Sequence, residues 1–94
     1  MAAAVIVVRP AFERAAKRLS RAQKDAVNMA VERLPMVFGR PHQHSGVGLR
    51  SFGRYFELRV GLGLRILFLA EGGDLHLCTV GNHDAVRAYV KNNG

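Results

Sequence analysis

The chain has 94 residues, of which 49% are hydrophobic, and its 14 Lys and Arg against 7 Asp and Glu give a formal net charge of +7. This length predicts a single domain over residues 1–94 with one core, and the hydrophobic fraction excludes a disordered chain. The charge favours a polyanionic partner, either a nucleic acid or an acidic protein. Because no apolar stretch is long enough to span a bilayer and Cys78 has no second cysteine to pair with, we expect a cytoplasmic protein.

The first half of the chain predicts one strand followed by two helices. The β-branched run Ala3–Val8 has the length of a strand and ends just before Pro10, which suits the first turn of a helix. Apolar residues then recur at helical spacing as far as Leu19. The sequence Ser20–Gln23 has the form of a capping box and predicts a second helix that ends, or bends in its last turn, at Pro35.

The second half predicts a loop, a three-stranded meander and a closing helix. The expected segments are a loop at Gly39–Gly48, strands at Tyr55–Val60, Leu64–Ala70 and Leu75–Val80, and a helix from about Asp84 to Lys91. The resulting β-α-α-β-β-β-α order predicts an α+β fold. We expect the first strand to add to the edge of the meander or to pair with a central strand. The helices are expected on one face of the sheet, with the other face partly open.

Strand alternation decides which polar side chains share a face of the meander. Glu57 and Arg59 lie two residues apart and therefore project from the same face. If Val60 pairs with Leu64 around a three-residue turn, Arg59 lies opposite Arg65 on that face. A two-residue turn would place the two arginines on opposite faces, because a slip of one residue inverts a strand.

Arg65 stands in an otherwise apolar strand and needs a partner, for which there are two interpretations. It either forms a structural ion pair with Glu57 or builds an anion site with Arg59, since a guanidinium is well suited to phosphate. His83 follows a Gly-Asn pair at a strand-to-helix junction. Its imidazole can exchange a proton near neutral pH, or it can simply cap the helix or face solvent.

Four other residues allow a functional interpretation. His42 and His44 alternate in the loop without a nearby cysteine or carboxylate, so we expect a surface loop without a metal, from which either could reach the open face. Cys78 lies in an apolar strand and is expected to be a buried, unreactive thiol. Tyr89 either packs on the apolar side of the last helix or stacks on a nucleobase.

These motifs resemble the RelE/ParE superfamily of bacterial toxin–antitoxin toxins. The resemblance spans nearly the whole chain, and its specific content lies in Leu49–Val90. The matching motifs are YFELRVG at Tyr55–Gly61, LRILF at Leu64–Phe68 and VGNHD at Val80–Asp84, with an aromatic residue six positions after His83. The helical half matches only in its layout.

The resemblance implies both an activity and a set of partners. RelE-like members are ribosome-dependent ribonucleases that cut mRNA in the decoding site, through attack of the ribose 2′-OH on the adjacent phosphate, without a metal or other cofactor. The implied partners are a cognate antitoxin, the ribosome and mRNA. Arg65 matches the arginine that contacts the scissile phosphate, Arg59 a supporting basic position, and His83 a basic proton donor.

The remaining site residues follow with looser matches. Tyr89 matches an aromatic that some members use, and His44 falls in the loop where some members place a general base. Glu57 is a second candidate for that base, or it only orients Arg65. Binding of RNA phosphates is expected of Arg50, Arg54 and Arg87.

Two alternatives within the superfamily stay open. RelE has lysines in the loop and in the first meander strand, where this chain has His42, His44, Arg50 and Arg54, so a different subset of groups would be needed for catalysis. The ParE branch keeps the fold and the hairpin arginines but poisons DNA gyrase. A third possibility is an inactive homologue that mainly binds its antitoxin.

Overall fold

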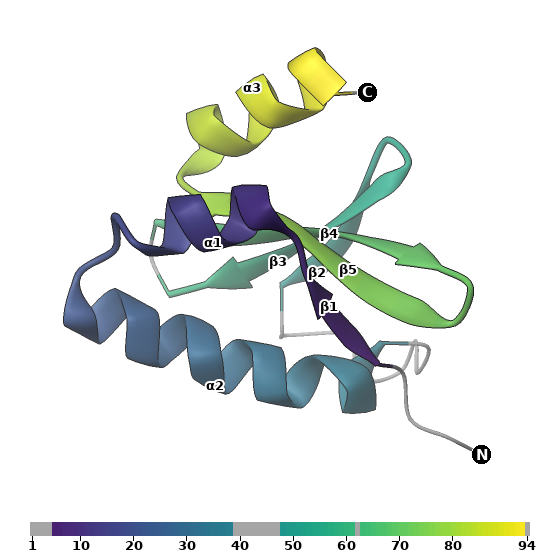
Figure 1. Ribbon diagram of the computed structural model, residues 1–94, viewed down its shortest axis with the longest axis horizontal. Helices are drawn as coiled ribbons and strands as arrows, with labels where there is room; N and C mark the ends of the chain where they lie inside the picture. The colour runs from purple at the N-terminus through teal and green to yellow at the C-terminus, as the bar shows by residue number, and fades with distance from the viewer. Residues whose placement is uncertain (1–4, 39–47, 62, 94) are drawn as a thin grey trace.

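The computed structural model describes residues 5–38, 48–61 and 63–93, which form an α+β fold (Figure 1). In chain order the elements are β1 (Ile6–Val8), α1 (Pro10–Ala16), α2 (Arg21–Val37), β2 (Leu49–Phe52), β3 (Tyr55–Val60), β4 (Leu64–Glu71), β5 (Asp74–Gly81) and α3 (His83–Asn93). The predicted loop, with His42 and His44, lies outside the described residues except for Gly48.

The strands in these residues form one mixed sheet in the order β1-β5-β4-β3-β2. Neighbours from β2 to β5 are antiparallel, whereas β1 runs parallel to β5 and forms an edge, one of the two places expected for it. The predicted element order was wrong in one respect, because β2 was not expected. It is only four residues long, lies between Gly48 and Gly53, and shows no alternation of apolar and polar residues, so no strand pattern marked it.

The two N-terminal helices begin where the sequence predicts. The Ser20 hydroxyl accepts a hydrogen bond from the Gln23 backbone N–H at 3.2 Å, and the Gln23 side chain accepts one from the Ser20 N–H at 2.9 Å, which completes the capping box. Helix α2 continues past Pro35 to Val37. Its apolar side, with Leu34 only 1% exposed, packs on the sheet and offsets the cost of a proline inside the helix.

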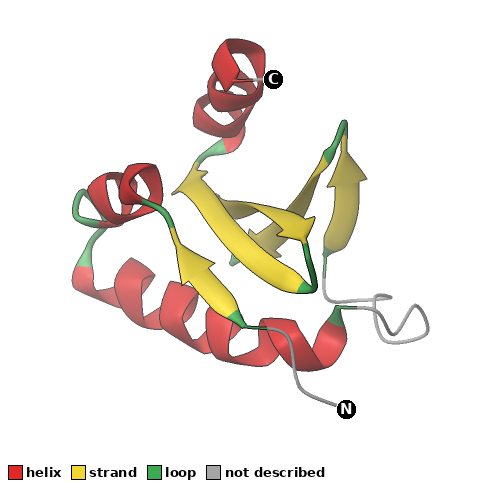
Figure 2. Cartoon of the chain, turned by 45° about the vertical axis from the view of Figure 1, so that its right-hand side comes forward, coloured by secondary structure: helices red, strands yellow, loops and turns green. Residues whose placement is uncertain are grey.

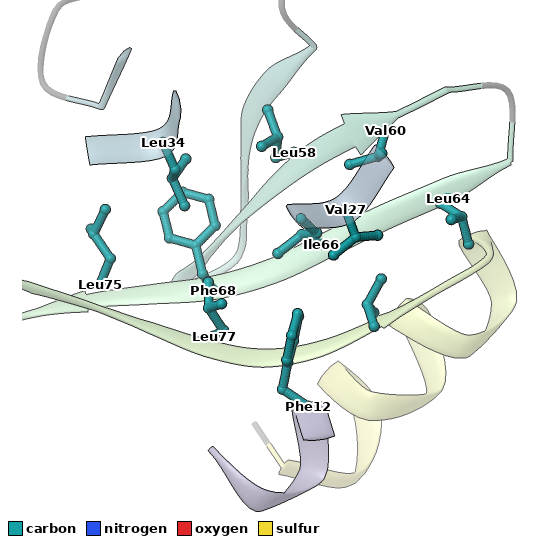
Figure 3. Packing of buried hydrophobic residues seen from close by; sticks show 11 residues of the cluster. Phe12, Val27, Leu34, Leu58, Val60, Leu64, Ile66, Phe68, Leu75 and Leu77 are labelled. Atoms are coloured by element: carbon teal, nitrogen blue, oxygen red, sulfur yellow. The ribbon is translucent and has the colours of Figure 1, made fainter. Parts of the chain in front are cut away.

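The main core lies between one face of the sheet and helices α1 and α2 (Figure 3). Phe68 of β4 is fully buried there, in a cluster whose other buried side chains come from both helices and from β3, β4 and β5. The labelled members of this cluster are Phe12, Val27, Leu34, Leu58, Val60, Leu64, Ile66, Phe68, Leu75 and Leu77. Full burial of one such side chain contributes about 1.5–3 kcal/mol, and this cluster has more buried side chains than the cluster on the opposite face.

Helix α3 packs on the opposite face, so the expectation that all helices share one face was wrong (Figure 2). A second buried cluster consists of Tyr55, Leu67, Cys78 and Val86. The physical reason is that β4 and β5 carry apolar residues on both faces, and a register shift at Leu67/Phe68 leaves Cys78 as an extra residue on β5. None of the helices in the described part of the chain is both long and apolar enough to cross a bilayer.

Candidate anion-binding site

Two arginines face each other at one end of the sheet. Arg59 pairs with Arg65 and Val60 with Leu64, so the β3–β4 turn has three residues, and the two-residue alternative is excluded. Gly61 in this turn has a φ of +63°, a conformation that glycine adopts without strain. Because side chains alternate along a strand, Glu57, Arg59 and Arg65 all project from the face that α3 partly covers.

Glu57 binds two arginines at once. Its Oε1 accepts hydrogen bonds from the Nε–H groups of Arg65 and Arg50, each at 3.1 Å. Arg50 is the direct cross-strand neighbour of Glu57 on β2. The Glu57 side chain is 3% exposed, against 19% for Arg65 and 56% for Arg50. The predicted ion pair between Arg65 and Glu57 is therefore confirmed, and a third strand extends it.

Arg59 is exposed and borders a small cavity. This cavity has a volume of about 90 Å³ and is lined by Arg59, Gly63, Leu64 and Arg65. Among the described residues, no hydrogen bond or ion pair reaches the Arg59 guanidinium. Three guanidinium groups against one carboxylate leave a local excess of positive charge, which favours a small anion in this cavity.

His83 lies at the same end of the sheet. Gly81, two residues before it, pairs with Arg65, and α3 begins at His83 itself. The helix cap is Asn82, whose Oδ1 accepts a hydrogen bond from the Ala85 N–H at 2.8 Å. His83 is partly buried, and Asn82 rather than His83 makes the capping hydrogen bond. Its Nδ1 is buried and has no hydrogen-bond partner in the described part of the protein.

Tyr89 is held away from the arginine pair. Its ring packs edge-on against that of Tyr55, with centroids 6.0 Å apart. Tyr55 precedes Arg59 by four residues, or about 13 Å along a strand. Partial burial raises the pKa of Tyr89, which lies beside the second cluster. These contacts fit the packing interpretation, and stacking on a nucleobase stays a prediction.

One of the other two predicted RNA-binding residues, Arg54, also lies away from the pair. Arg54 follows β2 in the turn, and its guanidinium carbon lies 5.2 Å from the centre of the Tyr55 ring. Arg87 is exposed on α3. Cys78 is buried as expected, and this burial raises the pKa of its thiol. His44 lies outside the described residues.

Gly48 is a structural requirement that the sequence interpretation missed. A Cβ atom at Gly48 would lie 2.8 Å from the Cβ of Arg59, and the residue has a φ of +76°. Its carbonyl accepts the Arg59 N–H at 3.1 Å. The four residues of β2 do not alternate between apolar and polar, so no strand pattern marked β2 or, with it, the second partner of Glu57.

Comparisons with known proteins bear on the fold. No family model matches the sequence, and no curated protein does. A mutant of the Escherichia coli toxin RelE in the free state has a TM-score of 0.71 at 13% identity, covering 99% of this chain and 100% of that chain.

Two antitoxin–toxin complexes contain similar chains. The RelB–RelE complex of Methanococcus jannaschii gives a TM-score of 0.68 at 13% identity, over 88% of this chain and 96% of that chain. The YoeB–YefM complex of Staphylococcus aureus gives a TM-score of 0.61 at 13% identity, over 87% of this chain and 99% of that chain. At this identity the likeness establishes the fold: the chain has the RelE-like toxin fold that its hairpin arginines and its last strand predict.

Proposed function

We propose that this chain is the toxin of a toxin–antitoxin system and that it cleaves mRNA on the ribosome. The observation that carries the proposal is the Arg59–Arg65 pair, which borders a cavity of about 90 Å³ at the end of the sheet where α3 begins. The fold shared with RelE and YoeB supports the toxin assignment. The ribonuclease activity is the one that the motif resemblance implies.

The proposed reaction needs only side chains. The ribose 2′-OH attacks the adjacent phosphorus, a 2′,3′-cyclic phosphate forms, and the bond from phosphorus to the 5′-oxygen breaks. Arg65 and Arg59 stabilise the negative charge that develops on the phosphate oxygens. His83 donates a proton to the departing 5′-oxygen.

The general base is a separate question. Glu57 is only 2% exposed, and its Oε1 already accepts two hydrogen bonds, so a substrate hydroxyl has little access to this carboxylate. This burial argues against Glu57 as the group that takes the 2′-OH proton. His44, outside the described residues, stays the candidate base.

Two further surfaces fit the proposed partners. Five cations on α1, α2 and the turn between them are exposed and suit phosphates of ribosomal RNA: Arg14, Lys17, Arg18, Arg21 and Lys24. A groove of about 380 Å³ runs beside β1, α1 and α2, and its lining combines apolar side chains with two lysines, Lys17 and Lys24, and one acid, Glu13. An acidic, amphipathic antitoxin segment would complement such a groove.

Inducible expression tests this function. The wild-type chain is compared with Arg65→Ala, His83→Ala and the exposed control Arg33→Ala, and a reporter mRNA is mapped by primer extension. We expect translation-dependent cuts for the wild type and the control, and none for the other two variants. Growth arrest with intact mRNA and an SOS response would instead favour gyrase poisoning. No arrest would favour a homologue that only binds its antitoxin.

A further inference from the structure

Glu57 is a buried carboxylate at the centre of a cationic cluster. It contacts Arg50 from β2 and Arg65 from β4, so three adjacent strands meet at one side chain. Both arginine Nε atoms lie 3.1 Å from the same oxygen and are therefore no more than twice that distance apart. The other oxygen, Oε2, is buried and has no hydrogen-bond partner among the described residues.

The pattern of hydrogen bonds differs from that of a saturated ion pair. An arginine and a carboxylate commonly form two parallel bonds, which occupy both oxygens and two guanidinium nitrogens. Here each arginine donates only from Nε, and both bonds end on Oε1. Within the described residues, the terminal amino groups of Arg65 make no hydrogen bond. Glu57 therefore fixes the orientation of Arg65 while leaving most of its donors for a ligand.

Charge alone does not explain this carboxylate. A negative charge next to an anion site weakens the attraction for the anion. A buried carboxylate with one unsatisfied oxygen is also costly to the fold. Glu57 therefore both weakens anion binding and costs stability, so we look for a role that compensates. The hydrogen bonds to the Nε atoms of Arg50 and Arg65 indicate such a role, the orientation of these side chains.

We propose that Glu57 is a positioning residue, which holds the Arg65 and Arg50 guanidinium groups so that Arg65 faces the cavity bordered by Arg59. The inference rests on the proposed function only for the identity of the anion as an RNA phosphate. Binding of a free anion tests the positioning role by itself, without RNA or ribosomes.

The direction in which phosphate affinity changes when Glu57 is replaced distinguishes a positioning role from a purely electrostatic one. Inorganic phosphate is titrated into the full chain by calorimetry, for the wild type, Glu57→Gln and the control Glu71→Gln. Glu71 is an exposed acid at the other end of β4, so its variant removes the same charge. We expect Glu57→Gln to weaken phosphate binding about tenfold or more, and Glu71→Gln to leave it unchanged. Tighter or equal binding by Glu57→Gln would overturn the proposal.

Glu57→Asp covers the case in which the glutamine variant does not fold. This variant keeps the charge but shortens the reach to both Nε atoms, so positioning predicts weaker phosphate binding with an unchanged circular dichroism spectrum. Binding equal to wild type would contradict the proposal.

Kinetics of RNA cleavage then separate the two proposals. If positioning is right, Glu57→Asp lowers kcat at least tenfold and changes KM little. A wild-type chain that binds phosphate but never cleaves RNA would remove the proposed function and leave the positioning role standing.

Discussion

The two faces of the sheet come from the same strands but differ in what they carry. The face under α1 and α2 is lined by aliphatic and aromatic side chains around Phe68. The face under α3 is apolar around Leu67 and Cys78, and charged at the end that holds Arg59 and Arg65. Because side chains alternate along a strand, β3 and β4 supply both faces at once. The comparison suggests that stability and activity can be changed separately, one face at a time.

The largest expected effect lies on the apolar face. Phe68→Ala removes a fully buried ring and should lower the free energy of unfolding by about 3–5 kcal/mol. Urea unfolding followed by circular dichroism measures this loss. A loss below about 1 kcal/mol would mean that the core is not centred on Phe68.

Substitutions on the charged face should change the rate of mRNA cleavage. Arg65→Lys keeps the charge but has neither the Nε–H that Glu57 accepts nor the planar fork that suits phosphate. We expect cleavage of mRNA to fall about 100-fold or more, as for loss of one transition-state donor. The exposed control Arg33→Lys should cleave like the wild type, and an Arg65→Lys variant that did the same would exclude Arg65 from the site.

Replacement of Gly48 should affect both stability and RNA cleavage. Gly48→Ala places a methyl group 2.8 Å from the Cβ of Arg59, whereas Gly53→Ala meets nothing within 4 Å although its φ is similarly positive. Both variants should lose about 1–2 kcal/mol of stability for a left-handed residue. Only Gly48→Ala should also reduce cleavage, because Arg59 has to move. Equal cleavage rates in the two variants would show that the position of Arg59 is unimportant.

The smallest effect concerns the apolar half of the α3 face. Burial raises the pKa of Cys78 above its usual value of 9.0, so the folded chain keeps the thiol proton at a pH where the unfolded chain loses it. Stability is therefore unaffected well below pH 9 and falls as the pH rises above it. Cys78→Ala should remove this part of the alkaline decline, measured as Tm against pH. An identical decline in the variant would assign it to other groups, such as Tyr89.

The arginine pair could be predicted from the sequence, but the elements that surround it could not. Alternation placed Arg59 and Arg65 on one face on the condition of a three-residue β3–β4 turn, which the structure has, and the capping box placed the start of α2. These features depend on residues close together in the chain. Which face α3 covers depends on how β4 and β5 share apolar residues between two clusters, and no short pattern states this.

The second partner of Glu57 could not be predicted for the same reason. Arg50 reaches Glu57 only because β2 pairs with β3 in one register. Missing the four-residue strand therefore meant missing the bridge between the two arginines. For Tyr89, the structure shows ring packing against Tyr55, which is one of the two interpretations that the sequence left open.

The pairing of β1 with β5 also sets the order in which the protein can assemble. Ile6 is synthesised well before its partner Leu75. At about 5–20 residues per second, ribosomes need several seconds to make the chain between them. Arg65, moreover, pairs with Gly81, which is made later still. A nascent chain thus carries an unfinished sheet and no assembled arginine site until β5 has been made.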